Sequence, residues 1–183
     1  MVSTYDYAAL SAAVYSDGGV GEASNSGWIR LQNYSNSETG FFAALFENGA
    51  GEHVLAFRGT EPLLGNGDQP FQSKDTQTDL EVLRGRVPEQ FADAIRVYRE
   101  VAGMNDISVT GHSLGGGLAS YVAAKNPSIE ASVFNSLGIA KLVDPGSYAN
   151  IRNYNNSADP VTLFGPKQIG QKFSINGQGI NLG

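Results

Sequence analysis

The 183-residue sequence has no cysteine and few charged residues. Without cysteine, the chain has no disulfide, no thiolate nucleophile and no cysteine-based metal site. Charged residues make up 16% of the chain, against roughly 25% in typical domains, so we expect a neutral, polar surface. The formal net charge is −6 and the sequence has no basic stripe, which argues against a nucleic-acid partner.

Long apolar runs are also missing. No stretch reaches the ~18 apolar residues of a transmembrane helix. Residues 1–6 lack the basic start and apolar core of a secretory signal peptide. A chain without cysteine is suited to export, so secretion is slightly favoured over a cytoplasmic location, while the compartment and the oligomeric state stay open. Apolar residues are 41% of the chain, enough for one domain with its own core.

The sequence does contain a Gly-x-Ser-x-Gly motif, at residues 111–115, between an apolar run and a segment of small residues. This pattern predicts a strand, a sharp turn and a helix, which together form the nucleophile elbow of an α/β hydrolase. Glycine is needed two residues before and after Ser113, because a Cβ there would strike the backbone. Ser113 would then stand on a strained corner, and the N–H of Leu114 would favour an oxyanion. Glycine and serine are frequent here, so the motif alone also fits an ordinary Gly-rich turn.

The remaining segments follow the pattern of an α/β fold. An Ala-rich helix is predicted over residues 5–15 and an amphipathic helix from Pro88 to 101. Strands are predicted over residues 28–31, 41–46, 54–57, 106–110, 131–135, 150–154 and 171–175, with a turn over 33–40 and a helix over 114–125. The first three strands predict an antiparallel meander, and the later alternation of strands with helices indicates parallel βαβ units.

Two further motifs lie at predicted strand ends on either side of the elbow. Residues 56–60, Ala-Phe-Arg-Gly-Thr, end an upstream strand, and residues 154–161, Tyr-Asn-Asn-Ser-Ala-Asp-Pro-Val, end a downstream strand. In this order, with Gly-His-Ser-Leu-Gly-Gly between them, they resemble the class 3 (fungal-type) lipase family of α/β hydrolases over roughly residues 41–166. The resemblance implies an α/β-hydrolase fold: a mostly parallel sheet with an antiparallel N-terminal meander and helices on both faces.

The same resemblance implies roles for individual residues. Ser113 matches the nucleophile, Asp159 the acid that orients the catalytic histidine, and Thr60 the second oxyanion residue beside Leu114. All of them follow predicted strands, so they are expected at one edge of the sheet. Two plainer interpretations stay open, because Asp159 also suits a turn before proline and Thr60 an ordinary strand end.

Residues 61–78 fall where the family places its lid. The segment is longer and more polar than a short amphipathic lid helix, and a loop of this length is typical of a functional segment. Its apolar residues Leu63, Leu64 and Phe71 are candidates for the acyl-facing side of a lid. They fit ordinary loop anchors equally well.

No histidine follows Asp159, although the order of the hydrolase triad is serine, acid, histidine. Of the two histidines, His112 is expected to line the site, and His53 to lie at the opposite edge of the sheet. Three interpretations stay open: the sequence stops before the histidine, a partner or second fragment supplies it, or the chain is a non-catalytic relative. We expect the first, that is, a single catalytic domain over residues 1–183 truncated at its C-terminus.

The sequence therefore predicts a serine carboxylic-ester hydrolase, a lipase, esterase or phospholipase, that forms an acyl-enzyme on Ser113. Its partner would be an ester or lipid substrate, including a lipid interface, and this chemistry requires no cofactor and no metal. Two alternatives stay open. One is a binding or scaffold protein on the same fold without catalysis, and the other is a thioesterase, acyltransferase or peptidase that uses the same serine.

Overall fold

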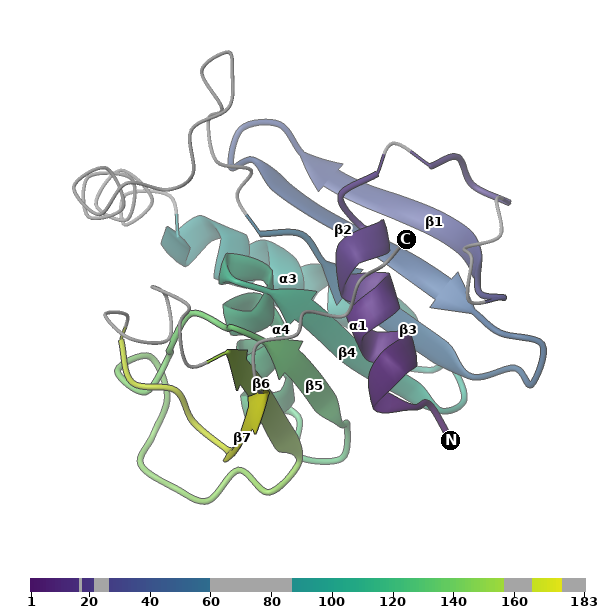
Figure 1. Ribbon diagram of the computed structural model, residues 1–183. Coiled ribbons are helices and arrows are strands. Elements are labelled where there is room, and N and C mark those ends of the chain that lie inside the picture. The colour runs from purple at the N-terminus through teal and green to yellow at the C-terminus, as the bar shows by residue number, and fades with distance from the viewer. Residues whose placement is uncertain (17, 22–26, 60–86, 157–165, 176–183) are drawn as a thin grey trace, which may run out of the picture.

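Seven strands form one sheet, and their order across the sheet is their order in the sequence (Figure 1). The structure is a computed structural model that describes residues 1–16, 18–21, 27–59, 87–156 and 166–175. Its strands are β1 (Ile29–Asn36), β2 (Phe41–Glu47), β3 (His53–Phe57), β4 (Ile107–His112), β5 (Ala131–Phe134), β6 (Ile151–Asn156) and β7 (Gln171–Ile175). Its helices are α1 (Thr4–Ala13), α3 (Val87–Val101) and α4 (Leu114–Lys125).

The sheet changes direction at β3. Strands β1, β2 and β3 pair antiparallel, and every pair from β3 to β7 is parallel. The predicted meander and the predicted parallel units are therefore both confirmed. Because β3 to β6 run in the same direction, the residues that follow them emerge at one edge of the sheet, where ligands bind in open α/β folds.

Strand β1 is longer than predicted. Its last residue, Asn36, pairs with Phe41, so the turn comprises residues 37–40 rather than 33–40, and Gly40 closes it at a φ of 74°. The Asn- and Ser-rich sequence has the composition of a loop. Tyr34 is nevertheless buried while its neighbours in the strand face outward, as expected of a strand with one solvated face.

Helices cover both faces of the sheet, as predicted (Figure 1). Strand β3 shows why, because its residues Val54 to Phe57 are apolar and buried on both sides of the sheet. Its residues Val54 and Ala56 pack in the cluster that includes α1, whereas Leu55 and Phe57 pack in the cluster that includes α3 and α4. Among the described residues, no helix is both long and apolar enough to cross a bilayer.

Helix α1 is held in place at its first turn. Ser3 and Asp6 form a capping box, and the indole Nε1 of Trp28 donates a hydrogen bond to the Asp6 carboxylate at 3.1 Å. Burial raises the pKa of Asp6, but the hydrogen bonds from Ser3 and Trp28 outweigh burial and hold that pKa below its usual value. The helix is thereby fixed over the sheet, and its last turn leads to Tyr15, which reaches the elbow.

Candidate active site

Ser113 occupies a strained backbone conformation between β4 and α4. Its φ is 54° and its ψ is −125°, and a positive φ is uncommon for any residue other than glycine. Ser113 stands at the N-cap of α4, yet its hydroxyl makes no capping hydrogen bond to the helix. A serine at this position ordinarily stabilises the helix through such a bond. The hydroxyl of Ser113 therefore does not cap α4. The strained backbone conformation of Ser113 costs free energy that no capping bond offsets.

The glycines on either side of Ser113 are required by their surroundings. A Cβ on Gly111 would lie 2.4 Å from the carbonyl of Gly115, and a Cβ on Gly115 would lie 2.2 Å from the carbonyl oxygen of Phe57. Real Cβ atoms essentially never approach other atoms this closely. The prediction that only glycine fits at these two positions is confirmed, and the second contact shows that the elbow is pressed against the end of β3.

The backbone of Ser113 is clamped by the neighbouring strand. Its N–H donates to the carbonyl of Phe134 at 3.1 Å, and its carbonyl accepts from Leu137 at 2.9 Å and from Gly117 at 3.2 Å. The N–H of Leu114 lies in the first turn of α4, where backbone N–H groups have no acceptor within the helix. A negatively charged oxygen beside Ser113 would therefore meet the N-terminal end of a helix, and the role of Leu114 in an oxyanion site stays a prediction.

Tyr15 holds the segment that leads to Thr60. The Tyr15 hydroxyl accepts a hydrogen bond from the N–H of Gly59 at 2.9 Å. A Cβ on Gly59 would lie 3.0 Å from the carbonyl oxygen of His112, so this segment lies directly against the elbow. Thr60 itself lies outside the described residues, as do Asp159 and the lid candidates Leu63, Leu64 and Phe71.

We expect Tyr15→Phe to remove the acceptor of the Gly59 N–H. The free energy of unfolding should fall by about 1 kcal/mol, the usual value for one hydrogen bond. If the site is catalytic, kcat should fall while KM stays unchanged, because the segment before Thr60 loses its support. The matched control is Tyr5→Phe, since Tyr5 lies on α1 but is 56% exposed. Steady-state kinetics measure the fall in kcat, and urea unfolding measures the loss of stability. Equal behaviour of the two variants would contradict the role of Tyr15 in supporting Gly59.

Strand β6, which precedes Asp159, is anchored to β5 by a polar network. Asn156 donates its N–H to the side chain of Asn135 at 2.7 Å, and Asn135 takes a positive φ of 41°. Behind this contact, Asn155 and Gln168 hydrogen-bond each other through both of their amide groups, at 2.9 and 3.0 Å. Gln168 also donates to the carbonyl of Ser136 at 2.8 Å.

This network was not predicted. Its members are buried, with exposures of 7% for Asn155, 8% for Gln168 and 1% for Ser136, so each polar group needs a partner. A signal was present in the sequence, because Asn153 and Asn155 stand at alternate positions of the strand and so share the buried face of Ile151. The network fixes the points at which the chain leaves β6 and returns before β7.

The described contacts of the two histidines do not identify either of them as the base for Ser113. His53 pairs with Ile107 at the start of the parallel strands. Ile107 lies six residues before Ser113, so His53 is about 20 Å from Ser113 along the strand direction. His53 instead contacts the carbonyl of Asn105 and, at 3.4 Å, the carboxylate of Glu47, so its predicted place at the opposite edge is confirmed.

His112 is the last residue of β4 and directly precedes Ser113. Because side chains alternate along a strand, it lies on the same side of β4 as Thr110. The Thr110 hydroxyl donates to the carbonyl of Tyr7 in α1, so this is the face that α1 covers. The expectation that His112 lines the site stays a prediction. Within the described ranges, no three His, Asp or Glu side chains are grouped to hold a metal.

A mainly parallel sheet with a serine on a strained strand–turn–helix corner defines an α/β hydrolase. Within that class, the chain belongs to the Tle-like phospholipase domain family, whose model matches residues 6–174. The resemblance to lipases of this fold is thereby confirmed. None of the curated proteins compared with the chain matches it.

Fungal lipases of known structure share the fold. The triacylglycerol lipase of Penicillium expansum is 16% identical over 95% of this chain and 78% of its own, with a TM-score of 0.54. The Rhizomucor miehei lipase in its propeptide complex is 18% identical over 94% of this chain and 67% of its own, with a TM-score of 0.57. The lipase of Rhizopus microsporus var. chinensis is 15% identical over 89% of this chain and 68% of its own, with a TM-score of 0.55. At these identities the likeness concerns the fold.

Proposed function

We propose that the protein is a serine hydrolase of lipid esters, with Ser113 as the nucleophile. The observation that carries the proposal is the φ of 54° at Ser113, held by two glycines that tolerate no Cβ. Such strain costs on the order of 1–3 kcal/mol and persists where the surroundings enforce it, which is common at active sites. Membership of a phospholipase-like family favours lipid esters, including phospholipids, as substrates.

In the proposed reaction, the Ser113 hydroxyl oxygen attacks the ester carbonyl while a base takes its proton. The carbonyl oxygen becomes an oxyanion, which the N–H of Leu114 and Thr60 stabilise. The C–O bond to the alcohol then breaks, and the alcohol leaves with the proton. Water releases the acid from the acyl-enzyme by the same steps. Asp159 orients the imidazole that serves as base.

A non-catalytic binding protein on the same fold is the weaker alternative. A binding protein would not explain the strained corner, because the Ser113 hydroxyl does not cap α4 and so gives the strain no structural benefit. A thioesterase, acyltransferase or peptidase would use the same serine and differ only in the group that it attacks. Family membership favours the lipid ester over these.

The test is covalent labelling with a fluorophosphonate in the presence of free imidazole. We expect the label on Ser113 and on no other serine, because this serine stands on the strained corner where a helix N-terminus would stabilise an oxyanion. Peptide mass spectrometry locates the label. Labelling spread over several serines, or none on Ser113 at any imidazole concentration, would argue against the nucleophile and for a binding protein.

A further inference from the structure

Two segments meet beside the elbow at the carboxyl edge of the sheet. The segment that follows β5 begins at residues 136–137, where the N–H of Leu137 donates to the carbonyl of Ser113. A few residues later, the N–H of Ala140 donates to the carbonyl of Lys167 at 3.0 Å, so this segment runs against the one that precedes β7. Ala140 and Lys167 are therefore held a few residues along the chain from Leu137, which contacts the backbone of the candidate nucleophile.

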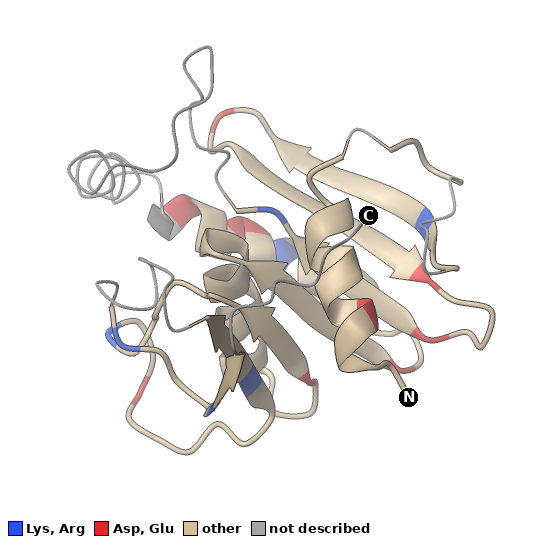
Figure 2. Cartoon of the chain, in the orientation of Figure 1, with Lys and Arg blue, Asp and Glu red and all other residues tan. Residues whose placement is uncertain are grey.

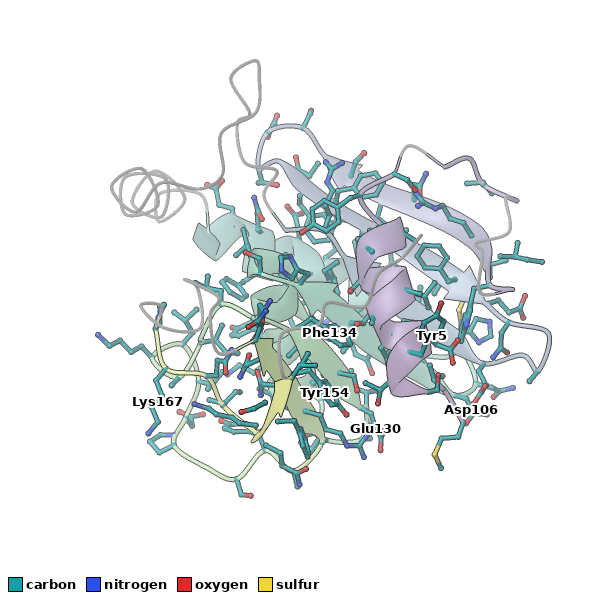
Figure 3. The ribbon with its side chains drawn as sticks, viewed as in Figure 1. Tyr5, Asp106, Glu130, Phe134, Tyr154 and Lys167 are labelled. Carbon is teal, nitrogen blue, oxygen red and sulfur yellow. The ribbon has the colours of Figure 1, made fainter. Side chains whose placement is uncertain are left out.

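Lys141, Leu142 and Lys167 are exposed at this junction, and we call them the lysine rim. Leu142 is 49% exposed, and its N–H donates to the carbonyl of Ile139 at 2.8 Å, which closes a turn. The lysine rim thus presents one exposed apolar side chain beside two cations on a hydrogen-bonded backbone. Lys167 lies at the outer margin of the molecule, on the side away from the β1–β3 meander (Figure 3).

The lysines of the rim have no ion-pair partner among the described residues. Elsewhere, Arg96 pairs with Asp93 and Glu100, and Arg152 pairs with Glu130. Asp144 is the one carboxylate in residues 135–156 and 166–175, which carry the basic residues Lys141, Arg152, Lys167 and Lys172. Figure 2 shows acidic residues around the meander, on α1 and on α3, with few on the segments that flank β6 and β7. These two ranges therefore carry more basic than acidic residues, whereas the whole chain has a net charge of −6.

We propose that the lysine rim docks the protein on an anionic phospholipid surface, with Leu142 inserted among the lipids. The proposal rests on the proposed function, since it would turn the edge that carries Ser113 toward the lipid. Lysines beside an apolar side chain are the usual means of binding such a surface: the ammonium groups meet the lipid phosphates and the apolar group enters the interface. The long lysine stems can bend to keep their charges at the phosphates.

The experiment measures binding to vesicles by co-sedimentation, with Ser113→Ala as the parent so that no lipid is hydrolysed. One set of vesicles is phosphatidylcholine alone, and the other contains equal parts of phosphatidylcholine and phosphatidylglycerol. Each lysine near an anionic surface contributes roughly five-fold in binding, so Lys141→Gln with Lys167→Gln should weaken binding to the anionic vesicles about 25-fold. Leu142→Ser should weaken it about five-fold, since about half of the leucine side chain is available for burial.

The matched control is Arg99→Gln with Lys125→Gln, which removes the same charge from the last turns of α3 and α4. Helix α4 leads away from the elbow for 12 residues, or about 18 Å, so these cations lie toward the opposite edge. Binding of the control should match the parent. Equal loss in both double variants, or equal binding of the parent to neutral and anionic vesicles, would overturn the proposal. Because binding is measured without hydrolysis, a failure of the proposed catalysis would appear in the labelling of Ser113 instead.

Discussion

Replacing Ser113 by alanine is expected to abolish ester hydrolysis that depends on added imidazole. General-base catalysis contributes about 10²–10⁴-fold, so free imidazole should raise the rate of the parent protein about 100-fold, at the lower end of that range. Ser113→Ala should show only the rate of imidazole in buffer. The measurement is hydrolysis of a p-nitrophenyl ester over a series of imidazole concentrations, with the rate of imidazole alone subtracted.

Ser120→Ala is a matched control on the same helix. Ser120 is 2% exposed, and its hydroxyl has no hydrogen-bond partner among the described residues, so its removal should leave stability and rate nearly unchanged. A Ser113→Ala variant whose imidazole-dependent rate stays within tenfold of the parent would rule out Ser113 as the nucleophile. Loss of activity in both variants would instead point to damage of α4.

Gly115→Ala is expected to cause the largest loss of stability of any single methyl addition at the elbow. The new Cβ would lie 2.2 Å from the carbonyl oxygen of Phe57 and 2.9 Å from the backbone of Arg58, and neither of these backbone atoms can yield without moving β3. Overpacking a rigid core costs on the order of 3 kcal/mol, which exceeds the roughly 1 kcal/mol that alanine gains over glycine in a helix. Urea unfolding followed by fluorescence measures the loss.

The single tryptophan, Trp28, is 1% exposed and reports unfolding directly. Gly49→Ala is the control, because Gly49 has no atom within 4 Å of its added Cβ and needs no positive φ. Its free energy of unfolding should change by less than about 0.5 kcal/mol. If Gly115→Ala were as stable as this control, the close packing of the elbow on β3 would be wrong.

The elbow could be predicted from the sequence because its geometry is local. Five consecutive residues determine whether a chain can turn from strand to helix with a serine at the corner, and the two glycines record that constraint directly. The parallel strands were also predicted, and of these β3, β4 and β5 are short, largely apolar runs between turn residues. The predicted end of β1 came too early, because the outward face of a half-buried strand has the composition of a loop. In residues 33–36, only the buried Tyr34 distinguishes a strand from a loop.

The supports of the site could not be predicted. The hydrogen bond between Tyr15 and Gly59 joins residues 44 positions apart, and the one between Ser136 and Gln168 spans 32 positions. Nothing in the local sequence shows which distant backbone group a buried side chain will reach. The roles of Thr60 and Asp159, and the lid candidates at Leu63, Leu64 and Phe71, lie outside the described residues and stay predictions.

The first turn of α4 has a consequence for how the protein folds. It contains three successive glycines, Gly115 to Gly117, and each costs a helix roughly 1 kcal/mol relative to alanine. A helix that begins this poorly cannot nucleate by itself in water. The contacts that compensate for the glycines come from β3, through Phe57, and from the segment after β5, through Ser136 and Leu137. We therefore expect the corner that presents Ser113 to form only after those strands have assembled, so that a partly folded chain does not yet hold Ser113 in its strained conformation.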